Sequence, residues 1–292
     1  MHPDIAILVK NQENVSAEWR DKLHGVEQRH YTYSSPLGNI IHYTLQCNTE
    51  RVRSTMAKTN ATPTPVKCRI CAENRPKVQL FIEWTAQPSG NEFDILINPF
   101  PIFPAHLTVV SKSHRPQHID AQDIQDFAFY SKMAVFFNGA DCGASIPGHM
   151  HYQAAPVECF NIVEDAQKCS LGENLTDCAS YIQGLERNVI LMTTSLSDNA
   201  SDKFNALMQR IHRADDRMIN VLVYWNESQK KFLWFIFPRQ KFRPDSFFAE
   251  NEEERLLISP ATAEMCGVIV TPDINTFNRI TIDDIHTIIA QS

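Results

Sequence analysis

Residues 143–153, Gly-Ala-Ser-Ile-Pro-Gly-His-Met-His-Tyr-Gln, contain the side chains best suited to chemistry. In an extended strand, side chains two residues apart point to the same side, so the spacing places His149, His151 and Gln153 on one face. A neutral imidazole is a good nucleophile near pH 7 when one ring N–H is held by an acceptor and the other nitrogen is free. The pattern therefore indicates a nucleophilic site. The alternative is a pair of packing or surface histidines beside a glycine-rich turn.

This segment resembles the Gly-x-Ser-x-Pro-His-x-His-x-Gln strand of the histidine-triad superfamily, in the branch of galactose-1-phosphate uridylyltransferases and diadenosine tetraphosphate phosphorylases. The resemblance implies that His151 attacks the α-phosphorus of a nucleotide and forms a covalent nucleotidyl-imidazole. We expect a main-chain carbonyl near His149 to hold the ring N–H. Gly143 and Ser145 can bring a backbone amide and a hydroxyl close to a bound anion. Here Gly148 is an extra residue between Ser145 and His149, so the loop must bulge.

The third position of the motif separates transfer from hydrolysis. Superfamily hydrolases usually carry a histidine there, whereas Gln153 has no acidic proton to give and can only hydrogen-bond phosphate oxygens. Such a site favours leaving groups and acceptors that are already phosphates, which indicates transfer or phosphorolysis. A hydrolase of nucleotide sugars or dinucleotides is the enzyme alternative, and an inactive nucleotide-binding module is the non-enzyme alternative.

A second motif is the C-x-x-C pair Cys68 and Cys71. Two thiolates at this spacing can bind one tetrahedral metal ion, which needs two further ligands. The uridylyltransferase resemblance implies a structural zinc held by Cys68, Cys71, His114 and His149. The alternatives are a redox dithiol and two structural thiols. The proline-containing loop expected over residues 59–67 argues against the redox dithiol.

Nucleotide contacts are expected in the run from Asn98 to His106, which resembles the segment beside the nucleotide in triad proteins. Phe100 and Phe103 could sandwich or line the base, with Asn98 near the ribose, and Asn138 is a nucleotide contact by the same resemblance. The alternative is an aromatic plug under a proline-stiffened loop, and His106 is more simply explained as a core histidine.

Phosphate charge must be neutralised by local basic residues. The candidates are Arg51 and Arg53, Arg75 beside the C-x-x-C loop, Lys112 and Arg115 around His114, and Arg239, Lys241 and Arg243 in the sequence PRQKFRP. Arginine suits bidentate recognition of phosphate. The alternative for each is a solvated surface charge.

Elements around these motifs must position them. Period-2 patterns and turn residues predict strands over residues 39–46, 78–84, 94–98, 106–111, 149–156, 220–225, 231–237 and 267–272. Helical spacing predicts helices over residues 15–28, 121–137 and 203–218, and one from about residue 282. Strand pairs mixed with single helices indicate an α+β fold, and no GxGxxG or P-loop pattern supports a doubly wound one.

Composition limits the class of protein. The 292 residues are 43% hydrophobic, enough for a sizeable core, and 27 basic against 34 acidic residues give a net charge of −7. An acidic chain is a poor candidate for binding nucleic acid or an anionic membrane. No apolar run approaches the roughly 18 residues of a transmembrane helix. We therefore expect a cytoplasmic protein whose cysteines are thiols or metal ligands.

The resemblance extends from about residue 40 to the end of the chain, and includes a bacterial family related to uridylyltransferases and GDP-hexose phosphorylases. It implies an antiparallel histidine-triad-like sheet with helices, in two related modules. We expect an N-terminal extension (residues 1–38), a catalytic module (39–185) and a degenerate second module (186–292). The second has no H-x-H, so it would supply acceptor contacts. The implied substrates are a nucleotide sugar or dinucleotide with phosphate or a sugar phosphate, and related enzymes suggest a homodimer.

Overall fold

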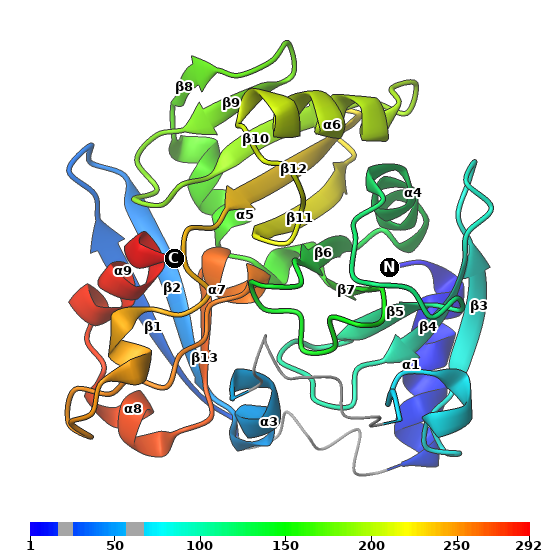
Figure 1. Ribbon diagram of the computed structural model, residues 1–292, viewed down its shortest axis with the longest axis horizontal. Coiled ribbons are helices and arrows are strands. Elements are labelled where there is room, and N and C mark those ends of the chain that lie inside the picture. Colours follow the sequence, from blue (N-terminus) through cyan, green and yellow to red (C-terminus); the bar gives the residue numbers. More distant parts are fainter. Residues whose placement is uncertain (17–25, 57–66) are drawn as a thin grey trace.

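The computed structural model of the protein describes residues 1–16, 26–56 and 67–292 (Figure 1). Within these ranges the helices are α1 (Pro3–Val15), α3 (Val52–Thr55), α4 (Ala121–Ser131), α5 (Ile162–Asp165), α6 (Ala200–Arg210), α7 (Thr262–Met265), α8 (Ile274–Arg279) and α9 (Ile282–Gln291). The strands are β1 (Glu27–Ser34), β2 (Ile40–Cys47), β3 (Phe81–Thr85), β4 (Glu92–Ile97), β5 (Leu107–Ser111), β6 (Ala134–Asn138), β7 (His151–Ala155), β8 (Leu171–Asn174), β9 (Ala179–Ile182), β10 (Ile190–Thr194), β11 (Ile219–Asn226), β12 (Lys231–Pro238) and β13 (Val268–Thr271). None of these helices combines the length and apolar character needed to span a bilayer.

Ten of the described strands form one antiparallel sheet in the order β3-β4-β5-β7-β6-β11-β12-β10-β9-β8. Residues 81–155 supply the first five strands and residues 171–238 supply the other five. The two groups join where β6 pairs with β11, with Phe137 opposite Val221. In Figure 1 the sheet crosses the molecule from β8 to β3. The predicted α+β class with an antiparallel sheet is confirmed.

One face of this sheet packs against α1, α4 and α6. Its core joins Leu8 of α1, Phe127 of α4 and Leu207 of α6 to inward-facing strand residues such as Val109 and Tyr152. Because side chains alternate along a strand, the neighbours of these residues must point to the opposite face. His151 and Gln153 flank Tyr152 and therefore lie on that opposite face.

The opposite face carries a second core on only part of its width. Phe136 of β6, Leu222 of β11 and Phe235 of β12 pack there with residues of the smaller sheet β1-β2-β13 and of helices α5, α7, α8 and α9. In the smaller sheet β13 runs parallel to β2, with Ile269 opposite Leu45. Side chains of β4, β5 and β7 on this face instead border a cavity.

The predicted helix over residues 121–137 is wrong in its last turns. Helix α4 begins after Asp120, whose carboxylate accepts from the amides of Gln122 and Asp123, and it ends at Lys132 in the left-handed conformation (φ 56°). Residues 134–138 are strand β6, buried throughout between β7 and β11. A short apolar run that is buried on both faces has no strand-like alternation, so its spacing also fits a helix.

Other predicted elements are shifted or fall partly outside the described residues. Helix α6 covers residues 200–210 and not 203–218, because the chain turns at His212 (φ 55°). The helix expected over residues 15–28 is contradicted at both ends, because α1 ends at its first residue and β1 begins at residue 27. Residues 17–25 lie outside the described part of the chain. Residues 59–66 of the expected loop also lie outside it. The remaining predicted strands are present within a few residues. The division into two modules stays a prediction.

Candidate active site

His151 is the first residue of β7 and is 5% exposed. Its Nδ1 lies 2.8 Å from the carbonyl oxygen of His149. A carbonyl can only accept, so Nδ1 carries the proton and Nε2 carries the lone pair. Burial lowers the pKa of His151, which favours the neutral ring. The expected main-chain acceptor for this ring is therefore confirmed, and the imidazole is held in the tautomer that a nucleophile needs.

Gln117, between β5 and α4, holds the backbone of His151. Its Oε1 accepts from the His151 amide (2.9 Å), while its Nε2 donates to the carbonyls of His151 (2.9 Å) and Asn138 (3.1 Å). The β6–β7 pairing stops at Phe136 and Gln153, so the Gln117 carboxamide takes the place of a strand partner beyond that point. It fixes His151 where the two strands separate.

A cavity of about 410 Å³ lies against His151. The predicted site residues that line it come from many segments: Arg51, Asn98, Phe100, Asn138, Gly143, Ser145, His151 and Gln153. The C-terminal part of the chain lines it with Phe242, Ser259, Ala261, Ala263, Glu264 and Val270. The structure thus brings the predicted nucleophile and most predicted binding residues to one cavity. Residues 50–153 and the C-terminal part of the chain line it together.

The carboxamide of Gln153 has a defined orientation. The Ile102 amide donates to His106 Nδ1 (3.2 Å), so the proton of this neutral ring is on Nε2. Nε2 therefore donates to Gln153 Oε1 (2.9 Å), and the NH₂ group of Gln153 is left for the cavity. Burial lowers the pKa of His106 to about 3, so the ring stays neutral at physiological pH. His106 is a core histidine, and it makes Gln153 a donor.

Asn138 is oriented in the same sense. Its Oδ1 accepts from the Thr262 amide (2.9 Å) and from Asn220 Nδ2 (3.1 Å), which leaves its NH₂ group as the part available to the cavity. Two carboxamides thus offer N–H donors beside His151. Donors of this kind suit the oxygens of a phosphoryl group.

The loop before β7 accommodates the extra glycine. His149 N donates to the carbonyl of Ile146 (3.2 Å), which closes a turn, and Gly148 has open space where a Cβ would lie. Gly143 is different: its φ is 122°, and a Cβ there would lie 2.5 Å from the Cβ of Ala261. The close approach of this loop to the C-terminal part therefore needs glycine at position 143.

Asn98 and Arg51 shape the cavity wall around Phe100. Asn98 Oδ1 accepts from the Phe100 amide (2.8 Å), and its Nδ2 donates to Thr108 Oγ1 (3.0 Å). Arg51 Nη1 donates to the Phe100 carbonyl (3.1 Å). Burial lowers the pKa of Arg51, and the nearby carboxylate of Glu264 opposes this shift. Glu264 is itself 6% exposed, and burial raises its pKa.

Several predicted contacts lie elsewhere. The buried Arg239 does not line the cavity and donates to backbone carbonyls and to Asn220, so its assignment as a phosphate contact is wrong. Lys241 pairs with the exposed Asp245 (2.8 Å) away from the cavity. Arg243 packs on Phe242 and donates to Ser259 Oγ (3.0 Å) behind the wall. Phe103 is buried in the second core and does not reach the cavity.

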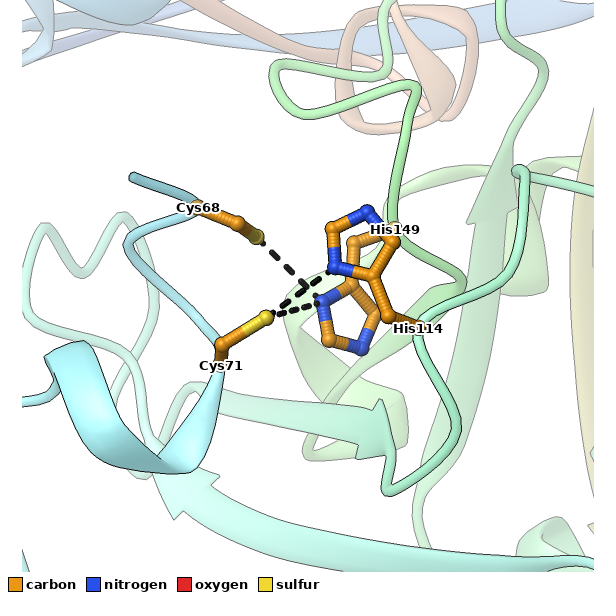
Figure 2. A group of neighbouring side chains, drawn as sticks. All are labelled: Cys68, Cys71, His114 and His149. Atoms are coloured by element: carbon orange, nitrogen blue, oxygen red, sulfur yellow. Dashed lines mark hydrogen bonds between the residues drawn. The ribbon is translucent and has the colours of Figure 1, made fainter. Parts of the chain in front are cut away.

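Cys68, Cys71, His114 and His149 meet in space as expected (Figure 2). Their donor atoms all lie within 4.8 Å of one another, and Nδ1 of His149 is 3.3 Å and 3.4 Å from the two sulfurs. His114 Nδ1 is 3.1 Å from Cys71 Sγ. A tetrahedral zinc site would set its sulfur and nitrogen ligands about 3.5 Å apart. The cluster could therefore hold a metal ion.

Two further contacts stabilise this cluster. His149 Nε2 lies 2.7 Å from the Ser111 carbonyl, which keeps the proton on Nε2 and turns Nδ1 toward the thiols, an arrangement typical of ligating histidines. Arg75 forms a buried ion pair with Asp94 (2.6 Å) and donates to the Ile70 carbonyl (2.7 Å). Arg75, predicted as a phosphate contact, therefore anchors the C-x-x-C loop to β4.

Gln117, Asn220, Thr262 and Glu264 are site residues that the sequence analysis did not single out. Each lies in or near an apolar run or an irregular loop with no spacing signal. Gln117, Asn220 and Thr262 act through partners distant in the chain, and Glu264 lines the cavity. Arg69, inside the C-x-x-C pair, also lines the cavity. Its place next to the predicted metal loop was the one available hint.

Comparison with known proteins gives one family. Residues 8–156, half of the chain, match the family described as "Domain of unknown function (DUF4922)". The chain belongs to this family. No curated protein sequence matches the chain.

Solved structures show which fold this family member has. Yeast Ap4A phosphorylase Apa2 in complex with Ap4A is similar at 16% identity and a TM-score of 0.59, covering 97% of this chain and 96% of that one. The same enzyme in complex with AMP gives a TM-score of 0.60 at 16% identity, covering 100% and 97%. The similarity spans both halves of the chain and confirms the histidine-triad-like fold.

Proposed function

We propose that the protein is a nucleotidyltransferase or phosphorylase that works through a covalent nucleotidyl-His151 intermediate. One observation carries the proposal: the Nδ1–H of His151 is committed to a backbone carbonyl, on a ring that borders the same cavity as Ser145 and Gln153. An imidazole held in this way has its nucleophilic nitrogen available for phosphorus.

In the first step, Nε2 of His151 attacks the α-phosphorus of a nucleotide sugar or dinucleotide. The N–P bond forms as the P–O bond to the leaving group breaks, and the electron pair departs with a sugar phosphate or nucleoside polyphosphate. In the second step, an oxygen of inorganic phosphate or of a sugar phosphate attacks the same phosphorus and displaces Nε2. Each leaving group is a phosphate or a neutral imidazole, so neither step requires a strong acid at Gln153.

The donors around the cavity support this chemistry. The NH₂ groups of Gln153 and Asn138 can stabilise charge on phosphoryl oxygens in both steps, with Ser145 and the Gly143 backbone on the adjacent loop. Arg51 and Arg69 are cations in the cavity wall, and Phe100 offers a surface for a base. The ligands Ap4A and AMP of the yeast enzyme agree with a nucleotide substrate for this fold.

The metal that suits the Cys₂His₂ cluster is zinc, by ligand type and by spacing. Cys68, Cys71, His114 and His149 would occupy all four positions of a tetrahedral ion, so the ion would stabilise the fold around β7 and take no part in the reaction. Burial and then the neighbouring Cys68 raise the pKa of the Cys71 thiol to about 11, so binding an ion would release its proton.

The experiment is adduct trapping with nucleotides and nucleotide sugars labelled at the α-phosphate. We expect an acid-labile labelled protein with at least one donor, no label with His151→Ala, and normal labelling with His30→Ala, an exposed histidine. Label that persists in His151→Ala would refute the mechanism. The donor that labels the protein would identify the nucleotide.

Turnover with and without inorganic phosphate separates this proposal from the two alternatives. A phosphorylase requires phosphate for turnover and exchanges labelled phosphate into the donor. Equal turnover without phosphate would indicate a hydrolase, and tight nucleotide binding without adduct or exchange would indicate an inactive binding module.

A further inference from the structure

The guanidinium of Arg239 starts a chain of hydrogen bonds that ends at the cavity. The side chain is 0% exposed and donates to the carbonyls of Ser292 (2.9 Å), Pro260 (3.0 Å) and Lys241 (3.0 Å). Its Nη1 also donates to Oδ1 of Asn220 in β11. A guanidinium has donors only, so the oxygen of Asn220 must face Arg239.

This contact decides the direction of the next two bonds. With its oxygen toward Arg239, Asn220 directs its NH₂ group to the carbonyl of Cys142 (3.0 Å) and to Oδ1 of Asn138 (3.1 Å). The Thr262 amide donates to the same Oδ1 (2.9 Å). If the Asn138 carboxamide were reversed, its NH₂ group would meet two other N–H donors, and both hydrogen bonds would be lost. Asn138 is therefore held with its oxygen away from the cavity.

We propose that Arg239 and Asn220 are positioning residues that make Asn138 a hydrogen-bond donor to the transferred phosphoryl group. The inference rests on the proposed function, because it concerns how the same site binds phosphate. Arg239 then acts indirectly, because its guanidinium does not contact the substrate. Its hydrogen bond to Asn220 determines which end of the Asn138 carboxamide faces the substrate. The C-terminal part of the chain thereby determines the chemistry of a residue in β6.

The test uses Asn220→Asp in the full chain. The new carboxylate still accepts from Arg239 but can donate neither to Asn138 nor to the Cys142 carbonyl, so the contact with Arg239 is kept and the bond that orients Asn138 is lost. Asn278→Asp is the matched control, since Asn278 is an exposed amide whose Oδ1 also accepts from an arginine, Arg29 (3.1 Å). The probes are AMP, GMP, UMP and CMP, each paired with its nucleoside, which has no phosphate.

For the mononucleotide that wild type binds best, we expect Asn220→Asp to weaken binding about tenfold or more, the effect of losing one hydrogen bond to a charged group. The thermal midpoint of Asn220→Asp should fall, because two buried hydrogen bonds are lost. Binding of the matching nucleoside, measured where the variant is folded, should stay as in wild type, and Asn278→Asp should change neither quantity. Weaker nucleoside binding in equal measure would overturn the inference, because it would show a general disturbance of the cavity.

A double-mutant cycle separates action through Asn138 from a remote effect of the added charge. In an Asn138→Ala background, Asn220→Asp should have no further effect on mononucleotide affinity. An undiminished effect in that background would overturn the inference, as would wild-type affinity of Asn220→Asp, while leaving the nucleotidyl-His151 proposal intact. If wild type binds none of the four mononucleotides and forms no adduct, the proposed function itself fails.

Discussion

Single residues in this site act by their hydrogen-bond direction more than by their charge. His106 is neutral and buried, yet its tautomer decides that Gln153 presents an NH₂ group to the cavity. Asn138 is held in the same sense by Thr262 and Asn220. Around a nucleophile that attacks phosphorus, donors stabilise the developing charge and misdirected carbonyls would repel it.

Two substitutions of His106 separate its two hydrogen bonds. His106→Asn keeps an acceptor near the Ile102 amide and loses the donor to Gln153, whereas His106→Gln is long enough to reach Gln153 with an N–H. We expect His106→Asn to reduce the rate of adduct formation about tenfold or more and His106→Gln to reduce it less. Rapid-quench labelling measures both rates. Equal rates in the two variants would contradict the orienting role of His106.

The same histidine predicts a pH dependence of stability. Its pKa falls from 6.5 to about 3 on folding, so below pH 6.5 the unfolded chain binds a proton that the folded protein excludes. The folded state therefore loses stability as pH falls from 6.5 toward 3, by at most about 5 kcal/mol from this group. Urea unfolding of wild type and His106→Gln at pH 7, 5 and 4 measures it. The variant should lose less stability on acidification, and parallel curves would contradict the prediction.

At the scale of elements, the C-x-x-C loop is attached to the large sheet in two ways. The first is the cluster that Cys68 and Cys71 form with His114 and His149, and the second is the ion pair between Arg75 and Asp94. The carbonyl of His149, two residues before β7, accepts the Nδ1–H of His151. Disorder in the C-x-x-C loop would therefore also disturb the position of the His151 ring. A structural metal here would therefore affect activity indirectly.

Removal of the metal should lower stability before it changes chemistry. We expect the purified protein to contain about one zinc per chain, and chelation or Cys71→Ser to lower the thermal midpoint by several degrees. Elemental analysis and thermal unfolding test this, with Cys178→Ser, a cysteine outside the cluster, as the control. A chain without zinc whose midpoint is unchanged by Cys71→Ser would show that the four residues are structural thiols and histidines only.

The buried ion pair should matter more than a surface pair on the neighbouring strands. Arg75→Met leaves the Asp94 carboxylate buried without its partner and should cost about 3–5 kcal/mol. Lys112→Met removes the exposed pair with Glu83 and should leave the free energy of unfolding close to that of wild type. Urea unfolding provides both values. Similar costs for the two variants would show that Arg75 does not anchor the loop.

At the scale of the whole molecule, the cavity is lined by two separate parts of the chain, residues 50–153 and residues 242–270. Strands β5, β6 and β7 supply part of its lining, and Ala261, Glu264 and Val270 supply another part. The large sheet also joins five strands from residues 81–155 to five from residues 171–238. Strands β8 and β9 precede the expected module boundary at residue 185 but belong to the second group, and the division into residues 39–185 and 186–292 stays a prediction. The homodimer stays a prediction.

Two glycines of the loop before β7, Gly143 and Gly148, test the close contact between this loop and Ala261. Gly143→Ala would place a Cβ 2.5 Å from that of Ala261 at a φ of 122°, so we expect a loss of about 2 kcal/mol or more and a marked fall in adduct formation. Gly148→Ala meets open space and should leave the free energy of unfolding within about 0.5 kcal/mol of wild type. Equal stability of the two variants would contradict the close contact at Ala261.

The sequence, together with the family resemblance, predicted the strand that carries His151, the four possible metal ligands and eight of the residues that line the cavity. The strand and the C-x-x-C pair follow from local facts, namely the two-residue period of a strand and the spacing of two cysteines, whereas His114 and the nucleotide contacts were implied by the resemblance. The α+β class also followed from the mixture of strand pairs and single helices, and the antiparallel sheet was implied by the resemblance.

Only the tertiary structure decided what β6 is and what Arg239 does. The apolar residues 134–138 fit a helix as well as a central strand, and pairing with β7 and β11 selected the strand. A basic residue in PRQKFRP looks available for phosphate, but Arg239 is buried among carbonyls supplied by residues as distant as Ser292. Hydrogen-bond partners that meet across the fold leave no trace in local spacing, and here they determine which groups face the cavity.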